Sequence, residues 1–227
     1  MCGRFTLTAD VVALQKTFPW LNIPAEITPR YNIAPTQPVA VVPNDGKNQL
    51  DFYIWGLIPS WAKDPQMGKR LINARAETLA EKPAFRAAFH RRRCLILADG
   101  FFEWQQTKGM PKTPLFIRLT SGEPFAFAGL WEVWNSSDGS TIFSCAIITT
   151  QPNELMEKIH NRMPVILPRD AYPIWLDPGE QKLNQLSSLL RPYPADEMQA
   201  YPVSRLVNSP SNDSPQCIVP AQDSMSS

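Results

Sequence analysis

Residues 94–104 read CLILADGFFEW, and the first five of them form a continuous apolar run. Such a run is typical of a strand that is buried on both faces. Glu103 follows it, flanked by three aromatic residues. A carboxylate among aromatic side chains is partly desolvated, which raises its pKa and suits it to general acid-base chemistry. The alternative is a carboxylate paired with an arginine, which is a common structural arrangement.

Strand patterns recur along the whole chain, and the helical patterns between them are short. The predicted strands are 39–42, 50–55, 94–98, 115–119, 125–131, 142–149, 165–167 and 198–203. The predicted helices are 11–18 with Thr8 as N-cap, 76–90 broken at Pro83, 153–159, 170–176 and 180–190. This order predicts an α+β fold: a single compact domain with a mostly antiparallel sheet or barrel core and short peripheral helices. We expect the domain to span 1–207 and a weakly ordered Ser/Pro-rich tail to span 208–227.

Composition supports a folded globule, because 44% of the residues are hydrophobic and only 19% are charged. The net charge of +1 hides an uneven distribution. The segment 61–118 has 12 Lys and Arg against 5 Asp and Glu, so the rest of the chain is acidic. Such a segment favours a face that binds a polyanion, or a solvated surface whose charge is cancelled by acidic neighbours. Composition alone leaves both open.

The four cysteines are Cys2, Cys94, Cys145 and Cys217. No C-x-x-C pair occurs, and two histidines give no zinc-site spacing, so we expect neither a metal nor a cofactor. Cys94 and Cys145 lie in apolar runs and are predicted core residues. Without a signal peptide or an 18-residue apolar stretch, we expect a soluble cytoplasmic monomer with no membrane partner, nucleoid-associated in a bacterium or nuclear in a eukaryote.

Cys2 has an unusual position, one peptide bond from the start of the chain. If Met1 is removed, Cys2 carries a free α-amine and a thiol on adjacent carbons. The amine can form an imine with an aldehyde, and the thiol can then close a five-membered thiazolidine. Both groups titrate near neutral pH, at roughly 7.7–8.0 and 8.5. The alternative is that Cys2 merely follows the initiator.

Other polar residues have a chemical and a structural interpretation. His160 can shuttle protons near neutral pH, or be held by a backbone carbonyl. Because side chains alternate along an extended segment, Asn73 and Arg75 lie on the same face of it. There the Asn73 amide can orient a small polar group and Arg75 can hold a phosphate, or both can make hydrogen bonds in a turn or at the surface. His90, beside three arginines, is interpreted as charged surface.

Trp55 and Trp61 flank a proline-containing loop that leads into the basic segment. Aromatic rings interleaved with Lys and Arg are typical of surfaces that bind single-stranded nucleic acid. Trp55, at a strand end, is predicted to be core. Trp61 is predicted to be exposed.

Seven motifs occur in an order that resembles the SRAP family, the SOS-response-associated peptidases or abasic-site-processing proteins. They are residues 1–5 (MCGRF), 31–36 (YNIAPT), 55–61 (WGLIPSW), 72–78 (INARAET), 98–104 (ADGFFEW), 159–164 (IHNRMP) and 203–205 (VSR). The resemblance implies an α+β domain with a basic channel for single-stranded DNA containing abasic sites. It also implies that Cys2, after Met1 removal, forms a thiazolidine with the ring-opened abasic sugar.

The resemblance assigns further roles residue by residue. Asn73, Glu103 and His160 match the other active-site positions of the family. Arg4, Arg75 and Arg162 match positions expected to hold DNA phosphates, and Pro35 and Trp61 match positions that shape the channel or stack in it. Some members have a second large aromatic residue where this chain has Ala62. The three arginines at 91–93 lie outside the motifs, so their role stays open.

Three functions follow from these residues. In the first, Glu103 and His160 move the protons that open the sugar and Asn73 orients the Cys2 amine; some lyase activity is compatible with it. In the second, Cys2, His160 and Glu103 form a hydrolase triad of a cysteine or N-terminal-nucleophile peptidase, which includes self-removal of Met1. In the third, the protein is a non-catalytic reader of modified DNA.

Overall fold

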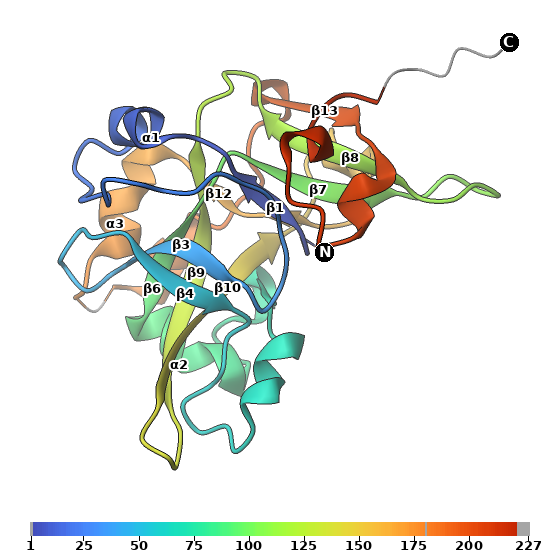
Figure 1. Cartoon of the computed structure of the whole chain (residues 1–227). Coiled ribbons are helices and arrows are strands. Elements are labelled where there is room, and N and C mark those ends of the chain that lie inside the picture. The colour runs from blue at the N-terminus through green and yellow to red at the C-terminus, as the bar shows by residue number, and fades with distance from the viewer. Residues whose placement is uncertain (1, 180, 222–227) are drawn as a thin grey trace, which may run out of the picture.

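The computed structural model describes residues 2–179 and 181–221, and within them the strands form two sheets (Figure 1). The smaller sheet is antiparallel throughout. Its strands in spatial order are β13 (Met198–Pro202), β8 (Thr113–Leu119), β7 (Gly100–Gln105), β1 (Phe5–Leu7) and β2 (Arg30–Ile33).

The larger sheet closes on itself, because β9 pairs with β10 as well as with β6. The ring of strands is β10 (Thr141–Thr150), β4 (Asp51–Trp55), β3 (Pro38–Pro43), β6 (Arg93–Ala98) and β9 (Phe125–Asn135). Closure pairs the backbone N–H and C=O groups that edge strands of an open sheet would leave without partners. Three short strands extend it: β11 (Met163–Pro164), β12 (Ile166–Leu167) and β5 (Asn73–Arg75). Only β4 and β5 run parallel to β10, so the predicted α+β fold around a mostly antiparallel sheet or barrel is confirmed.

Residues 94–104 connect the two sheets, since β6 lies in the barrel and β7 in the smaller sheet. Asp99 stands at the crossing. Its carboxylate accepts hydrogen bonds from the backbone N–H groups of Thr8 and Ala9 and from the Thr8 hydroxyl. Gly100 is required here, because a Cβ would lie 2.2 Å from the Phe116 ring. The apolar run 94–98 is wholly buried, as its pattern predicts.

The helices are short and peripheral: α1 (Val11–Thr17), α2 (Pro83–Arg91), α3 (Tyr172–Leu176) and α4 (Leu183–Ser188). The N-cap of α1 is Asp10, whose side chain accepts from the Ala13 N–H, and not the predicted Thr8, which is bound to Asp99 instead. The predicted break at Pro83 is confirmed, because the helical pattern over 76–90 divides into a 3₁₀ turn at Ala76–Thr78 and the helix α2. Proline has no N–H to lose in the first turn, so Pro83 begins α2.

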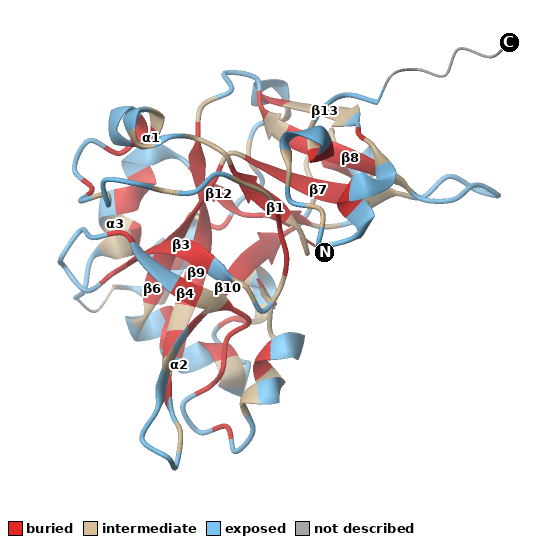
Figure 2. Cartoon of the chain, viewed as in Figure 1, coloured by how far each residue is buried: buried red, intermediate tan, exposed pale blue. Residues whose placement is uncertain are grey.

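Seven short 3₁₀ segments of three to six residues lie in other connections of the described chain. They are Pro65–Arg70, Ala76–Thr78, Met156–Lys158, Arg169–Ala171, Ala195–Glu197, Arg205–Asn208 and Pro215–Cys217. The predicted helix 153–159 is therefore one short turn. Figure 2 shows the buried residues gathered in the barrel and along β7 and β8, with the hairpin tips exposed.

Residues 203–221, which we call the C-terminal strap, pack on the smaller sheet (Figure 1). The Asp213 carboxylate accepts the N–H groups of Tyr31 and Asn32, and Cys217 is fully buried. The predicted tail from 208 is thus wrong for residues 208–221, whose side chains satisfy buried backbone groups. Its remainder, 222–227, lies outside the described residues.

Candidate active site

Cys2 lies three residues before β1 of the smaller sheet and is hydrogen-bonded to Asn73 of β5, a short strand that pairs with β10 of the barrel. The Arg4 carbonyl accepts the Phe102 N–H of β7, which fixes the N-terminal segment against that strand. The Cys2 carbonyl accepts a 2.8 Å hydrogen bond from Asn73 Nδ2 on β5. Since β5 belongs to the larger sheet, Cys2 is held between the two sheets.

Asn73 is positioned by the parallel pairing of β5 with β10, where it lies opposite Ile147. Its Nδ2 is committed to Cys2, but its Oδ1 is buried and makes no hydrogen bond within the part of the chain that the structure describes. A buried carbonyl oxygen without a donor is costly in a native protein. The atom is therefore available to accept a hydrogen bond from a ligand or from an amine at the site.

The Cys2 thiol is fully buried. Burial raises its pKa far above the ordinary value, and the nearby Glu103 carboxylate raises it further. The thiol is therefore protonated at neutral pH. Glu103 is only 3% exposed and sits on β7 opposite Leu115 of β8. The predicted burial of this carboxylate is confirmed.

His160 follows the 3₁₀ turn Met156–Lys158, and its N–H bonds the Met156 carbonyl. Its Nδ1 accepts the Arg162 N–H at 3.1 Å. The same Nδ1 lies 3.3 Å from the Arg162 carbonyl oxygen, so the backbone of Arg162 holds the imidazole ring in either tautomer. His160 and Glu103 line the same hollow, of about 560 Å³. The structure thus brings the predicted acid-base pair to one cavity.

The three arginines expected to hold phosphates have different environments. Arg162 donates to both carboxylate oxygens of Glu77, at 2.6 and 2.9 Å, and to the Thr149 carbonyl. These bonds lower the pKa of Glu77. Arg4 donates to Asn32 and lies over the Trp104 ring, 5.8 Å from its centroid.

Arg75 is exposed. The Nε–H groups of Arg4 and Arg162 are buried and make no hydrogen bond to any residue that the structure describes. Arg162 uses both terminal nitrogens to bind Glu77 and Thr149, and Arg4 uses Nη1 to bind Asn32 and Val207. The Nε–H group of each arginine is a donor that these bonds leave unused.

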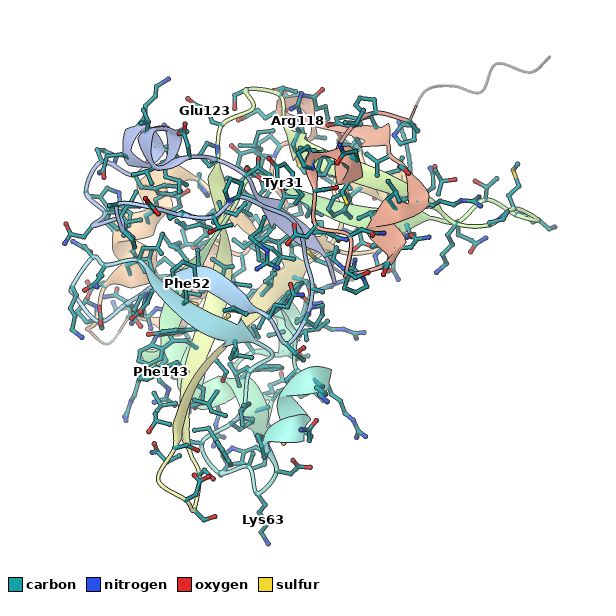
Figure 3. All side chains as sticks on the ribbon, viewed as in Figure 1. Tyr31, Phe52, Lys63, Arg118, Glu123 and Phe143 are labelled. Atoms are coloured by element: carbon teal, nitrogen blue, oxygen red, sulfur yellow. The ribbon has the colours of Figure 1, made fainter. Side chains whose placement is uncertain are left out.

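Trp61 is 58% exposed and Trp55 is buried, as predicted. The indole N–H of Trp55 donates a hydrogen bond to the Ile72 carbonyl. Ala62 is buried, and its carbonyl accepts the indole N–H of Trp134 at 2.7 Å. Ala62 occupies the position where some members of the family have a second aromatic residue, and here Trp134 of β9 packs beside it. Lys63, at the outer tip of this loop, points away from the body (Figure 3).

Pro35 lies beside Thr36, whose φ is +71°. This angle is unusual for a β-branched residue and indicates local strain. The Thr36 N–H bonds the Trp55 carbonyl, which ties the Pro35 turn to the start of the Trp61 loop. Pro35 and the loop that contains Trp61 thus meet at Trp55, the last residue of β4.

Arg93 contributes to the fold and is absent from the site, since it is fully buried and donates to four backbone carbonyls. Arg92 pairs with Glu132. His90 is exposed, as expected. The sequence did not identify Lys112 and Arg205, which line the hollow with Glu103 and His160. Arg205 belongs to the motif 203–205 (VSR), which could have identified it as a candidate site residue. No motif or local pattern in the sequence marks Lys112.

Within 2–179 and 181–221, no three His, Cys, Asp or Glu side chains gather so as to hold a metal ion. In the same described ranges, no helix is both long and apolar enough to cross a membrane.

Comparison with known proteins places these features in a family. A family model described as SOS response associated peptidase (SRAP) matches residues 1–210. The chain is 50% identical over 224 residues to the abasic site processing protein YoqW of Bacillus subtilis (strain 168), covering 96% of this chain and 99% of that protein. It is 31% identical over 271 residues to the abasic site processing protein HMCES of Rattus norvegicus, covering 97% of this chain and 76% of that protein.

Solved structures share the fold. A protein from Bacteroides thetaiotaomicron matches with a TM-score of 0.87 and 26% identity, covering 97% of this chain and 100% of the other. A protein from Bordetella bronchiseptica matches with a TM-score of 0.77 and 26% identity, covering 89% of this chain and 100% of the other.

Proposed function

This chain belongs to the SRAP family, and from that premise we propose that it processes abasic sites in single-stranded DNA by forming a covalent thiazolidine through Cys2. The active form is the chain that has lost Met1, because only then does Cys2 carry both an amine and a thiol. The observation that carries the proposal is the position of Cys2. Asn73 holds its carbonyl, and Glu103 acts on its thiol electrostatically.

The reaction begins with the sugar, which is mostly a closed hemiacetal. Glu103 accepts the C1′ hydroxyl proton as the bond between C1′ and the ring oxygen breaks, and this proton then passes to the ring oxygen, which becomes the C4′ hydroxyl of the open aldehyde. His160 hydrogen-bonds to the ring oxygen while negative charge develops on it. The Cys2 amine then adds to C1′, and loss of one water gives an imine. Asn73 keeps the amine in place through the adjacent carbonyl, and its free Oδ1 accepts an amine hydrogen.

Ring closure completes the adduct. The sulfur adds to the imine carbon, and the thiol proton passes by way of Glu103 to the imine nitrogen. Aldehyde and aminothiol thus become thiazolidine and one water. A protonated, buried thiol suits this order, because it stays unreactive until the imine is formed beside it.

The raised pKa of the Cys2 thiol weighs against a cysteine peptidase. Such an enzyme needs a thiolate, which a nearby imidazolium or helix N-terminus stabilises. Here burial and a carboxylate both disfavour the thiolate.

A denaturing gel with end-labelled abasic single-stranded DNA tests the proposal. The wild-type chain should shift the label, Cys2→Ala should not, and Cys217→Ala, which removes another buried thiol, should behave as wild type. His160→Ala should slow the shift roughly a hundredfold without weakening binding to undamaged DNA. A wild-type chain that binds the DNA but never shifts the label would be a non-catalytic reader, and the proposal would fail.

A further inference from the structure

The hollow beside Glu103 and His160 continues past these two residues. Its volume of about 560 Å³ lies within the range of pockets that enclose ligands, roughly 300–1,000 Å³. It therefore has room for more than the abasic sugar. The lining residues are Glu103, Trp104, Pro111, Lys112, His160, Arg205 and Asn208.

Two cationic side chains line the hollow from segments that belong to or pack on the smaller sheet. Lys112 comes from the hairpin between β7 and β8, and Arg205 comes from the C-terminal strap. Neither forms a salt bridge with any residue that the structure describes. The hollow therefore holds two cations and one carboxylate, that of Glu103, and this excess of positive charge favours an anionic group.

The wall that carries Arg205 is fixed by hydrogen bonds on both sides. Asn208 accepts the indole N–H of Trp104 at 2.8 Å, and the Val207 carbonyl accepts Arg4 Nη1 at 2.7 Å. The Ser204 hydroxyl accepts the Leu206 N–H. The backbone after Arg205 is thus anchored to β7 and the N-terminal segment, and the backbone before it is bound to the Pro114 carbonyl of β8 through the Val203 N–H. The backbone of Arg205 therefore has a defined place relative to β7.

We propose that Lys112 and Arg205 bind the DNA phosphodiester that joins the abasic nucleotide to its neighbour on one side. The inference rests on the proposed function, which puts the abasic sugar at Glu103 and His160. A phosphate attached to that sugar is the anion nearest to the two cations. Arg75 and Arg162 belong to the barrel side of the site, so the strand has phosphate ligands on both sheets.

The test compares crosslinking of three abasic substrates: one extended on both sides of the lesion, one ending at the lesion on its 5′ side, and one ending there on its 3′ side. The proteins are wild type, Lys112→Ala, Arg205→Ala, the double variant, and Lys47→Ala as an exposed control in the β3–β4 turn. On the fully extended substrate below saturation, the double variant should crosslink roughly tenfold more slowly, and Arg205→Lys should recover part of the rate.

The defect should disappear on one truncated substrate and persist on the other. Binding of undamaged single strands should lose about 0.7 from the slope of log affinity against log salt, as expected for one phosphate. Wild-type rates and an unchanged salt slope in the double variant would overturn the inference. A defect that is equal on both truncated substrates would overturn it as well.

Inhibition of wild type but not of the double variant by inorganic phosphate, with no effect of truncation, would make this a site for free phosphate and would also overturn the inference. Failure of the proposed function is a separate result, because the wild-type chain would then form no crosslink with any substrate.

Discussion

Two clusters of buried polar groups in this molecule differ in how completely their hydrogen bonds are made. In the first, Arg93 is fully buried behind β6 and donates to the carbonyls of Phe89, His90, Trp175 and Asp177. Every side-chain nitrogen of Arg93 has a backbone acceptor. This cluster joins the end of α2 to the segment that follows α3.

The second cluster lies along the N-terminal segment and β5, and its hydrogen bonds are incomplete. Asn73 Oδ1, Arg4 Nε and Arg162 Nε are buried and lack a partner among the described residues. Buried polar atoms are normally satisfied, so each exception requires an explanation. We infer that the saturated cluster stabilises the fold. We propose that the open atoms of the second cluster bind a ligand because of their place near Cys2, since Arg92 Nε and Arg118 Nε are also buried without a partner among the described residues.

Arg93→Met should have the largest effect on stability, because it leaves several buried carbonyls without donors. We expect the free energy of unfolding to fall by about 3–5 kcal/mol. Urea denaturation measures it, with Arg86→Ala on the exposed face of α2 as the control. A loss of less than about 1 kcal/mol would show that the Arg93 cluster does not hold these elements together.

Alkaline pH should weaken both regions, because Cys2 near the site and Cys94 near Arg93 are buried thiols with raised pKa values. Below roughly pH 8.5 the thiols are neutral in both states and their contribution is fully present. As pH rises above this value, only the unfolded thiols ionise, so stability declines by up to about 1.4 kcal/mol per pH unit for each thiol.

Unfolding free energies measured between pH 7 and pH 10 check this slope. Cys2→Ala and Cys94→Ala should each make it shallower. Slopes that do not change in either variant would mean that these thiols are already ionised, or equally accessible, in the folded protein.

Asn73→Ala should separate function from stability. The lost bond to the Cys2 carbonyl costs about 1 kcal/mol of stability, but the crosslinking rate should fall roughly tenfold to a hundredfold, because the amine is no longer oriented. Asn73→Asp keeps the shape without the donor and should be equally slow. A wild-type rate in both variants would remove Asn73 from the mechanism.

The parts of the fold that depend on local pattern could be predicted from the sequence. The apolar run 94–98 identified a buried strand, and the flanks of Trp55 and Trp61 separated a core ring from an exposed one. Strands β1 and β5 have three residues each, too few for a periodic pattern, and they exist because of their neighbours.

Long-range contacts explain the errors. Asp213 and Cys217 lie in a polar segment that resembles a tail, but they bind the N-terminal strands. Arg93 follows two other arginines and looks like surface, but it is surrounded by backbone carbonyls that only the fold brings together. Lys112 and Arg205 meet at the site for the same reason. Such pairings are set by topology and leave no mark in adjacent residues.

Glu77→Gln should give the smallest effect. Hydrogen bonds from Arg162 lower the pKa of Glu77, so its carboxylate contributes stability above about pH 4.3 that is lost as pH falls through the folded pKa. The variant should show a slightly flatter fall in stability between about pH 5 and pH 3. Glu123→Gln, in the exposed pair with Arg169, is the control. Identical acid curves for wild type and Glu77→Gln would contradict the assignment.

Intact mass spectrometry of the chain, before and after incubation with an abasic single-stranded oligonucleotide, tests the central claim most directly. Before incubation, we predict the mass of the chain without Met1. Afterwards, we predict a gain equal to the oligonucleotide minus one water, stable to denaturation. Cys2→Ser, which keeps the amine but cannot close the thiazolidine, should give no stable product. A wild-type chain that gains no mass, or a Cys2→Ala chain that gains the same stable mass, would contradict the account.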